Sequence, residues 1–150
     1  MRRILQIHLC IIYCSSGIEK ALGIQWWNGE AIWRSFMLPS FQQFNMSWLA
    51  KIPIIAMVIG WLTLIVETLY PIYVWLPKLR VIGIVSVICL HFFIGLFLGM
   101  WLFAIIMIIL TCTAFGYEAL NSLREYQVIK NFKLLRWKKN IFYKRISLSN

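Results

Sequence analysis

The sequence has very little charge. Only 13% of its 150 residues are charged, whereas soluble domains contain about 25%. In the same chain 61% of the residues are hydrophobic, and the mean hydropathy is +0.77. A soluble fold of this size could not bury so much apolar surface. The composition therefore argues against a soluble enzyme or binding domain, and it predicts a protein whose solvent is lipid.

Motifs for metal and nucleotide chemistry are also missing. The sequence has no H-x-x-x-H or H-E-x-x-H pattern for zinc and no glycine-rich loop for phosphate. We therefore expect no metal, and no cofactor is evident. There is no C-x-x-C either, and the cysteines all lie in apolar runs, which favours buried small hydrophobes over a disulfide framework. A thiol pair on one helix face, Cys10 with Cys14, is the alternative; the other two are Cys89 and Cys112.

Acidic residues are scarce, with five Asp and Glu against fifteen Lys and Arg. Many of the basic residues lie after residue 123: Arg124, Lys130, Lys133, Arg136, Lys138, Lys139, Lys144 and Arg145. A basic end on a soluble chain would suggest nucleic acid. Next to an apolar segment it favours contact with anionic lipid headgroups. We therefore predict the lipid bilayer as a partner of this tail, and no nucleic acid.

Long apolar runs predict the membrane spans, at about residues 4–22, 52–76, 81–98 and 100–116. The last two runs form one stretch about twice as long as the ~20 residues of a spanning helix. We expect a break near Gly95, Gly99 and Trp101, because glycine permits a tight turn and tryptophan favours the membrane interface. The predicted fold is all-α: an integral membrane helical bundle of about four transmembrane helices.

The distribution of basic residues decides between three spans and four. With four spans, Arg2, Arg3, Lys78, Arg80 and the basic tail all lie on one side, and Arg34 and Lys51 on the other. The positive-inside rule then places both termini in the cytoplasm of a multi-pass protein of the cell inner membrane. Residues 1–116 form the transmembrane domain, and residues 117–150 form a basic amphipathic cytoplasmic tail.

Two segments have further interpretations. The start of the chain, with Arg2-Arg3 before a short apolar run, also fits a signal peptide. Polar residues within and just after the run favour a helix packed in a bundle. The segment 23–51 is the longest outer loop, in which Asn28 and Glu30 predict the start of a short helix through 31–38 that ends before Pro39.

Ionisable groups inside the spans mark the candidate site, because such groups are costly in lipid and usually have a partner or a function. They are His8, Lys20, Glu67 and His91, and Gln6 and Tyr13 share a helix face with Lys20. We predict a polar seam inside the membrane from Gln6, His8, Tyr13 and Glu67. From the rise per residue, Lys20 and Glu67 lie at different depths, so His8 is the expected partner of Glu67. A lysine that extends to the outer headgroups is the alternative for Lys20.

Three blocks of sequence carry a resemblance to a known family. They are QIHLCIIYCSSGIEKALGIQWWNGEAIW at 6–33, ETLYP at 67–71 and RVIGIVSVICLHFFIGLFLGMWLF at 80–103. In order and spacing they resemble the HTTM domain, the bacterial membrane relatives of vitamin K-dependent γ-carboxylase, including the SdpB-like proteins. Lys20 occupies the place of the carboxylase's catalytic base, and His91 matches a histidine in the middle of a family helix.

The resemblance implies a function only in outline. Lys20 and His91 would be catalytic if the chain is carboxylase-like, and a quinone or vitamin K-type hydroquinone would then be the cofactor. The chain is considerably shorter than family members, which suggests a short member or the C-terminal part of a longer protein.

Three functional hypotheses follow from the sequence. The first is an HTTM-like inner-membrane protein of undetermined activity that serves export, maturation or modification of a membrane or secreted-peptide partner. The second is a membrane enzyme related to the carboxylase with Lys20 as base. The third is a structural subunit of a larger membrane complex.

Overall fold

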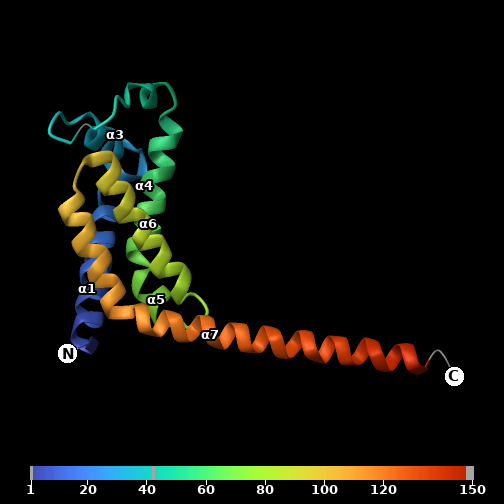
Figure 1. Cartoon of the computed structure of the whole chain (residues 1–150). Coiled ribbons are helices and arrows are strands. Elements are labelled where there is room, and N and C mark those ends of the chain that lie inside the picture. Colours follow the sequence, from blue (N-terminus) through green and yellow to red (C-terminus); the bar gives the residue numbers. More distant parts are fainter. Residues whose placement is uncertain (1, 42, 148–150) are drawn as a thin grey trace.

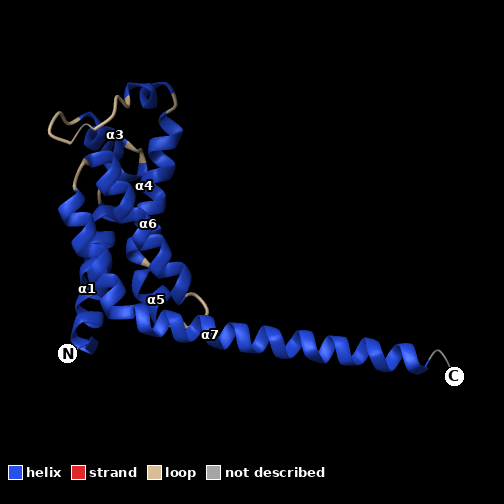
Figure 2. Ribbon diagram, viewed as in Figure 1, coloured by secondary structure: helices blue, strands red, loops and turns tan. Residues whose placement is uncertain are grey.

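A computed structural model describes residues 2–41 and 43–147, without the side chains of residues 125 and 128–147. Throughout the described part the regular elements are helices, joined by short loops (Figure 2). In chain order they are α1 (Arg2–Leu22), α2 (Ile24–Trp27), α3 (Glu30–Met37), the 3₁₀ helix η1 (Ser47–Lys51), α4 (Pro53–Thr68), α5 (Tyr70–Trp75), α6 (Arg80–Leu98) and α7 (Trp101–Ser147). The prediction of an all-α fold is confirmed.

The longer helices pack side by side into a bundle (Figure 1). Helix α1 packs against α4, α5 and α7, and α6 packs against α5 and α7. The main core lies toward the end of the bundle that carries the N-terminus; it contains Leu9, Tyr13, Tyr70, Val87 and Phe115. The core therefore joins residues of α1, α5, α6 and the first part of α7.

Two helices are long and apolar enough to cross a membrane, judged by length and composition. They are Arg80–Leu98, with a mean hydropathy of 2.7, and the stretch Trp101–Arg124 of α7, with a mean hydropathy of 1.9. Helix α4 is equally apolar in character but shorter. The predicted spans at 81–98 and 100–116 thus each coincide with a helix of suitable length.

The predicted span at 52–76 is divided into α4 and α5 at Leu69. Proline causes the break, since Pro71 has no N–H and cannot donate to the carbonyl of Glu67 four residues earlier. The chain continues in nearly the same direction because Tyr73 N donates to Leu69 O at 3.0 Å. The site residue Glu67 therefore lies within one turn of a helix break.

Two turns, at opposite ends of α6, follow local sequence signals. Between α6 and α7, Gly99 has a φ of 69°, a left-handed conformation that favours glycine. Of the residues near which a break is predicted, Gly99 and Trp101 flank it, while Gly95 lies within α6. The turn around Pro77 separates α5 from α6, as the sequence also predicts.

A small cap of helices covers the end of the bundle opposite the N-terminus. Ile32 of α3, Leu49 of η1 and Ala56 of α4 form its buried core. Helix α3 ends at Met37, just before Pro39, so the short helix predicted at 31–38 is present. Its start is fixed by Asn28, whose Oδ1 accepts a hydrogen bond from Glu30 N at 2.9 Å.

Helix α7 continues far beyond the bundle. It leaves the end that carries the N-terminus, turns away from the bundle axis and extends as a single helical arm (Figure 1). No break in the helix marks the predicted boundary at residue 116. The division into a domain and a tail stays a prediction. Most of the basic side chains of the predicted tail lie outside the part of the chain whose side chains the structure describes.

The surface of the bundle is apolar and part of its interior is polar. Ile11, Leu62, Ile82 and Ile109 are each more than half exposed. By contrast, the side chains of Gln6, Thr63, Glu67, His91 and Thr111 are buried. In a soluble protein charged and amide side chains are mostly exposed, so the burial of Gln6 and Glu67 departs from that pattern.

A candidate functional site along helix α1

Buried and half-buried polar residues form three layers along α1. The inner layer, near the N-terminus, contains Gln6 and Glu118. The middle layer contains Tyr13, Tyr70, His91 and Thr111. The outer layer contains Ser16, Lys20 and Glu67. Positions 6, 13 and 20 are seven residues apart, which is close to two helical turns, so one face of α1 carries all three layers.

In the inner layer, Gln6 connects α1 to α7. Its Nε2 donates to Ala114 O at 2.6 Å and to Glu118 Oε1 at 2.9 Å. Its Oε1 accepts a hydrogen bond from Arg3 at 3.1 Å, and Arg2 forms a salt bridge with Glu118 at 3.0 Å. These bonds join the first turn of the chain to the point where α7 leaves the bundle.

In the middle layer, Tyr13 Oη and His91 Nε2 share a hydrogen bond of 2.7 Å. The ring of Tyr13 also packs against Tyr70, with 4.3 Å between the ring centroids. Among the side chains that the structure describes, Tyr70 Oη, Thr111 Oγ1 and His91 Nδ1 are buried without a hydrogen-bond partner.

The two middle-layer tyrosines give a matched pair of substitutions. We expect Tyr13→Phe to destabilise the fold by about 1–3 kcal/mol, because it leaves His91 Nε2 buried without its partner. Tyr70→Phe removes a hydroxyl that has no partner, so we expect a change under about 0.5 kcal/mol or a gain. Thermal unfolding of the two variants in the same detergent compares them. Equal losses would show that Tyr70 Oη also has a stabilising partner, such as an ordered water.

In the outer layer, Lys20 and Glu67 form a salt bridge across α1 and α4. Ser16 completes it: its Oγ donates to Glu67 Oε2 at 3.0 Å and accepts from Lys20 Nζ at 2.7 Å. The ring of Trp26 lies over Nζ, 5.3 Å from it. Ion pair, hydroxyl and aromatic ring thus hold the lysine from three directions.

This salt bridge corrects a prediction from the sequence, which placed Lys20 and Glu67 too far apart to pair. The prediction assumed a register of α1 against α4 that put Lys20 and Glu67 at different depths. In the structure Gly17 of α1 lies against the backbone of Thr68 of α4, which brings Lys20 and Glu67 to nearly the same level. A side chain on an α-helix leans toward the N-terminus of its helix. Since α1 and α4 are antiparallel, Lys20 leans inward and Glu67 leans outward, and they meet at the level of Ser16.

His8 is the second correction. It was expected to pair with Glu67 as part of the seam, but its side chain is exposed on the surface of α1. Successive residues of a helix are about 100° apart. His8 is therefore on nearly the opposite side of α1 from Gln6, and burial of Gln6 turns His8 outward. The other predicted seam residues, Gln6, Tyr13 and Glu67, are all buried.

Comparison of the chain with known protein families, curated proteins and solved structures finds no match. Two contacts join the three sequence blocks that carry the HTTM resemblance: Tyr13 with His91 in the middle layer, and Lys20 with Glu67 in the outer layer. Block 6–33 contributes Tyr13 and Lys20, block 67–71 contributes Glu67, and block 80–103 contributes His91. The HTTM assignment and the catalytic roles of Lys20 and His91 stay predictions.

Sequence reasoning missed three members of the site. Glu118 falls in the predicted tail. The signal that could have identified it is charge: an acidic residue at the inner end of the last span is a natural partner for Arg2 and Arg3 at the start of the first span. Ser16 lies four residues before Lys20, a spacing that puts both on one face of a helix. Thr111 is one of few polar residues in an apolar run. Among the described side chains, His, Cys, Asp and Glu do not gather in the groups of three that a metal ion needs.

Proposed function

We propose that the chain is a multi-pass membrane protein that crosses the bilayer four times, through α1, α4 with α5, α6 and the first part of α7. The observation that carries this proposal is the apolar surface around a buried polar row. Exposed apolar area costs about 25 cal/mol per Å² in water and nothing comparable in lipid. Buried amide, carboxylate and imidazole groups facing the bundle interior are typical of membrane helices.

The ends of the bundle differ in charge. The end that carries the N-terminus holds Arg2, Arg3 and Arg80. There the guanidinium of Arg3 lies 5.4 Å from the ring centroid of Trp75, and Arg80 donates a hydrogen bond to Val74 O. Arg34 and Lys51 belong to the cap at the other end. The positive-inside rule then supports cytoplasmic termini and a cap on the outer side.

Fusions to alkaline phosphatase test this topology. We expect active enzyme, meaning an outer location, for fusions after Met37 and Met100, and inactive enzyme after Pro77 and after residue 150. Fusions to a fluorescent protein at the same points should give the opposite pattern. A phosphatase signal from the C-terminal fusion contradicts the four-span topology. Full release of the chain from membranes by alkaline carbonate contradicts membrane insertion altogether.

Within this topology we propose an HTTM-like role in export, maturation or modification of a partner polypeptide. The contacts of Lys20, Glu67, Tyr13 and His91 support it, since these contacts join the blocks that resemble the family. The carboxylase-like alternative requires Lys20 to present a lone pair to a substrate. In this structure Nζ donates to Glu67 and Ser16 instead, which favours a structural over a basic role.

A direct assay separates these alternatives. The protein, purified in detergent, is incubated with a vitamin K-type hydroquinone under oxygen and the epoxide product is measured. No product from a folded protein argues against the carboxylase-like enzyme. Product that disappears in Lys20→Arg, which keeps the positive charge, would establish it. For the hypothesis of a structural subunit, a monodisperse monomer without a companion polypeptide would be the contrary result.

A further inference from the structure

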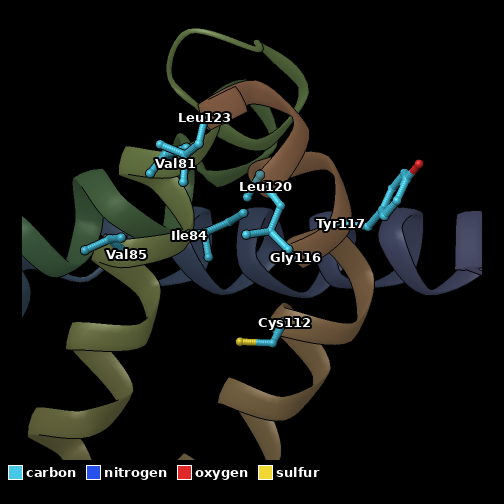
Figure 3. Close-up of a pocket in the computed structure, with 9 residues that line it drawn as sticks. Val81, Ile84, Val85, Cys112, Gly116, Tyr117, Leu120 and Leu123 are labelled. Atoms are coloured by element: carbon cyan, nitrogen blue, oxygen red, sulfur yellow. The ribbon is translucent and has the colours of Figure 1, made fainter. Parts of the chain in front are cut away.

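An apolar groove opens on the surface between α6 and α7, away from the polar row (Figure 3). Its floor and walls are Val81, Ile84 and Val85 of α6 and Cys112, Gly116, Tyr117, Ala119, Leu120 and Leu123 of α7. Figure 3 shows Cys112 at one end of the groove and Val81 and Leu123 together at the other. On α7 the lining covers about 16 Å of helix at 1.5 Å per residue. One leaflet of a bilayer core is about 15 Å thick, so the groove has the length of one acyl chain.

Gly116 leaves this groove open. A Cβ atom built on Gly116 would meet no heavy atom within 4 Å. The position therefore has space that an ordinary helical residue would fill, and glycine costs about 1 kcal/mol relative to alanine in a helix. The bundle itself gains no close packing from this glycine, in contrast to Gly17, which touches α4.

Positive charge lies at one end of the groove. Arg80 precedes Val81 on α6, and Arg124 follows Leu123 on α7, with Lys78 exposed in the turn before α6. Arg80 uses neutral acceptors: Val74 O at 2.8 Å, Trp75 O at 3.4 Å, Glu118 O at 3.3 Å and Ser122 Oγ at 3.0 Å. The carboxylate of Glu118 is bound by Arg2 on α1. The positive charge of Arg80 is thus not offset by a carboxylate among its contacts.

We propose that this groove is a binding site for an anionic phospholipid of the cytoplasmic leaflet. One acyl chain lies along Ile84, Gly116 and Leu120, and the phosphate lies near Lys78, Arg80 and Arg124. The site rests on the proposed membrane insertion and orientation. Charge complementarity selects this occupant over a second helix. The cations at the end of the groove attract the negative charge of a phosphate, whereas they would form no favourable interaction with an apolar helix.

Native mass spectrometry of the delipidated full-length protein tests the site. Phosphatidylglycerol and phosphatidylcholine with identical acyl chains are added in equal amounts, and the retained lipid is counted. Each Lys or Arg near an anionic surface contributes about a fivefold factor in binding. We therefore expect phosphatidylglycerol to be retained about tenfold or more over phosphatidylcholine, and Lys78→Gln with Arg124→Gln to remove most of that preference.

Two variants make the test specific to the groove. Gly116→Leu places a side chain in the groove, and its Cβ meets no heavy atom within 4 Å. We therefore expect it to abolish retention of both lipids without lowering the unfolding temperature, which higher helix propensity should if anything raise. Arg34→Gln with Lys51→Gln removes the same number of charges at the opposite end and should leave the preference intact. Equal retention of both lipids by the unaltered protein, or undiminished retention in Gly116→Leu, overturns the proposal.

The experiments also distinguish a failure of the lipid-site proposal from a failure of the proposed membrane insertion. A protein that resists extraction by alkaline carbonate but shows no lipid preference is a membrane protein without this site. A dimer in the mass spectrum that Gly116→Leu converts to a monomer would identify a second copy of the chain as the occupant and would likewise overturn the lipid proposal.

Discussion

Replacement of Lys20 by methionine is expected to destabilise the bundle by about 3–5 kcal/mol, the usual cost when one partner of a buried ion pair is removed. The Glu67 side chain is only 8% exposed. Without Nζ its carboxylate would keep the Ser16 hydroxyl as a partner but lose the compensating charge. Methionine retains most of the volume of the lysine stem, so packing changes little. The loss of unfolding free energy then measures the effect of removing the positive charge.

The reverse substitution should cost less. In Glu67→Gln the amide keeps an acceptor for Ser16, and the ammonium of Lys20 remains near the outer end of α1. The Lys20 side chain is 22% exposed, and a lysine so placed can extend its amine toward the headgroups. We expect a loss of about 1–2 kcal/mol, within the range for a hydrogen bond to a charged group.

The double variant isolates the pair. With Lys20→Met and Glu67→Gln combined, no buried charge is left without a partner, so most of the stability lost in Lys20→Met should return. Equilibrium unfolding of all four proteins in one detergent gives the coupling energy. If Lys20→Met unfolds at the same midpoint as the unaltered protein, the salt bridge contributes nothing to stability, and a chemical role for Lys20 gains support.

The positions of the helices could be predicted from the sequence because their signals are local. The span predicted at 81–98 is α6 within one residue, and the turn at Gly99 follows from the conformational freedom of glycine. The break at Leu69 was not predicted, although Pro71 gives its cause. Proline in a membrane helix is compatible with an uninterrupted span, and the sequence does not distinguish the two cases.

The contacts of the site could be predicted only in part, because they depend on how the helices pack. Helical spacing correctly groups Gln6, Tyr13 and Lys20 on one face of α1. It does not reveal the register of α1 against α4, on which the salt bridge of Lys20 and Glu67 depends. That register is set by the contact of Gly17 with Thr68, which involves residues 51 positions apart in the chain. The four-span topology and the HTTM-like function remain proposals, as they require a bilayer and an assay.

Substitution of Gly17 is expected to have the second large effect. A Cβ atom on Gly17 would lie 2.5 Å from Thr68 N and 2.8 Å from Thr68 Cα. Both are backbone atoms, so no side-chain rotation can relieve the clash, and α1 and α4 must separate. Small residues at such crossings let membrane helices approach closely. We expect Gly17→Ala to cost about 1–3 kcal/mol, the range for overpacking, and Gly17→Leu to prevent assembly of the bundle.

Gly116→Ala is the matched control for this effect. The same methyl group is added to a helical glycine, but at Gly116 it meets nothing within 4 Å. Higher helix propensity should then make Gly116→Ala more stable by up to about 1 kcal/mol. Unfolding temperatures of the two variants should therefore move in opposite directions. A loss at Gly17 no larger than the change at Gly116 would contradict the close approach of α1 and α4. The register that joins Lys20 to Glu67 would then have to come from other contacts.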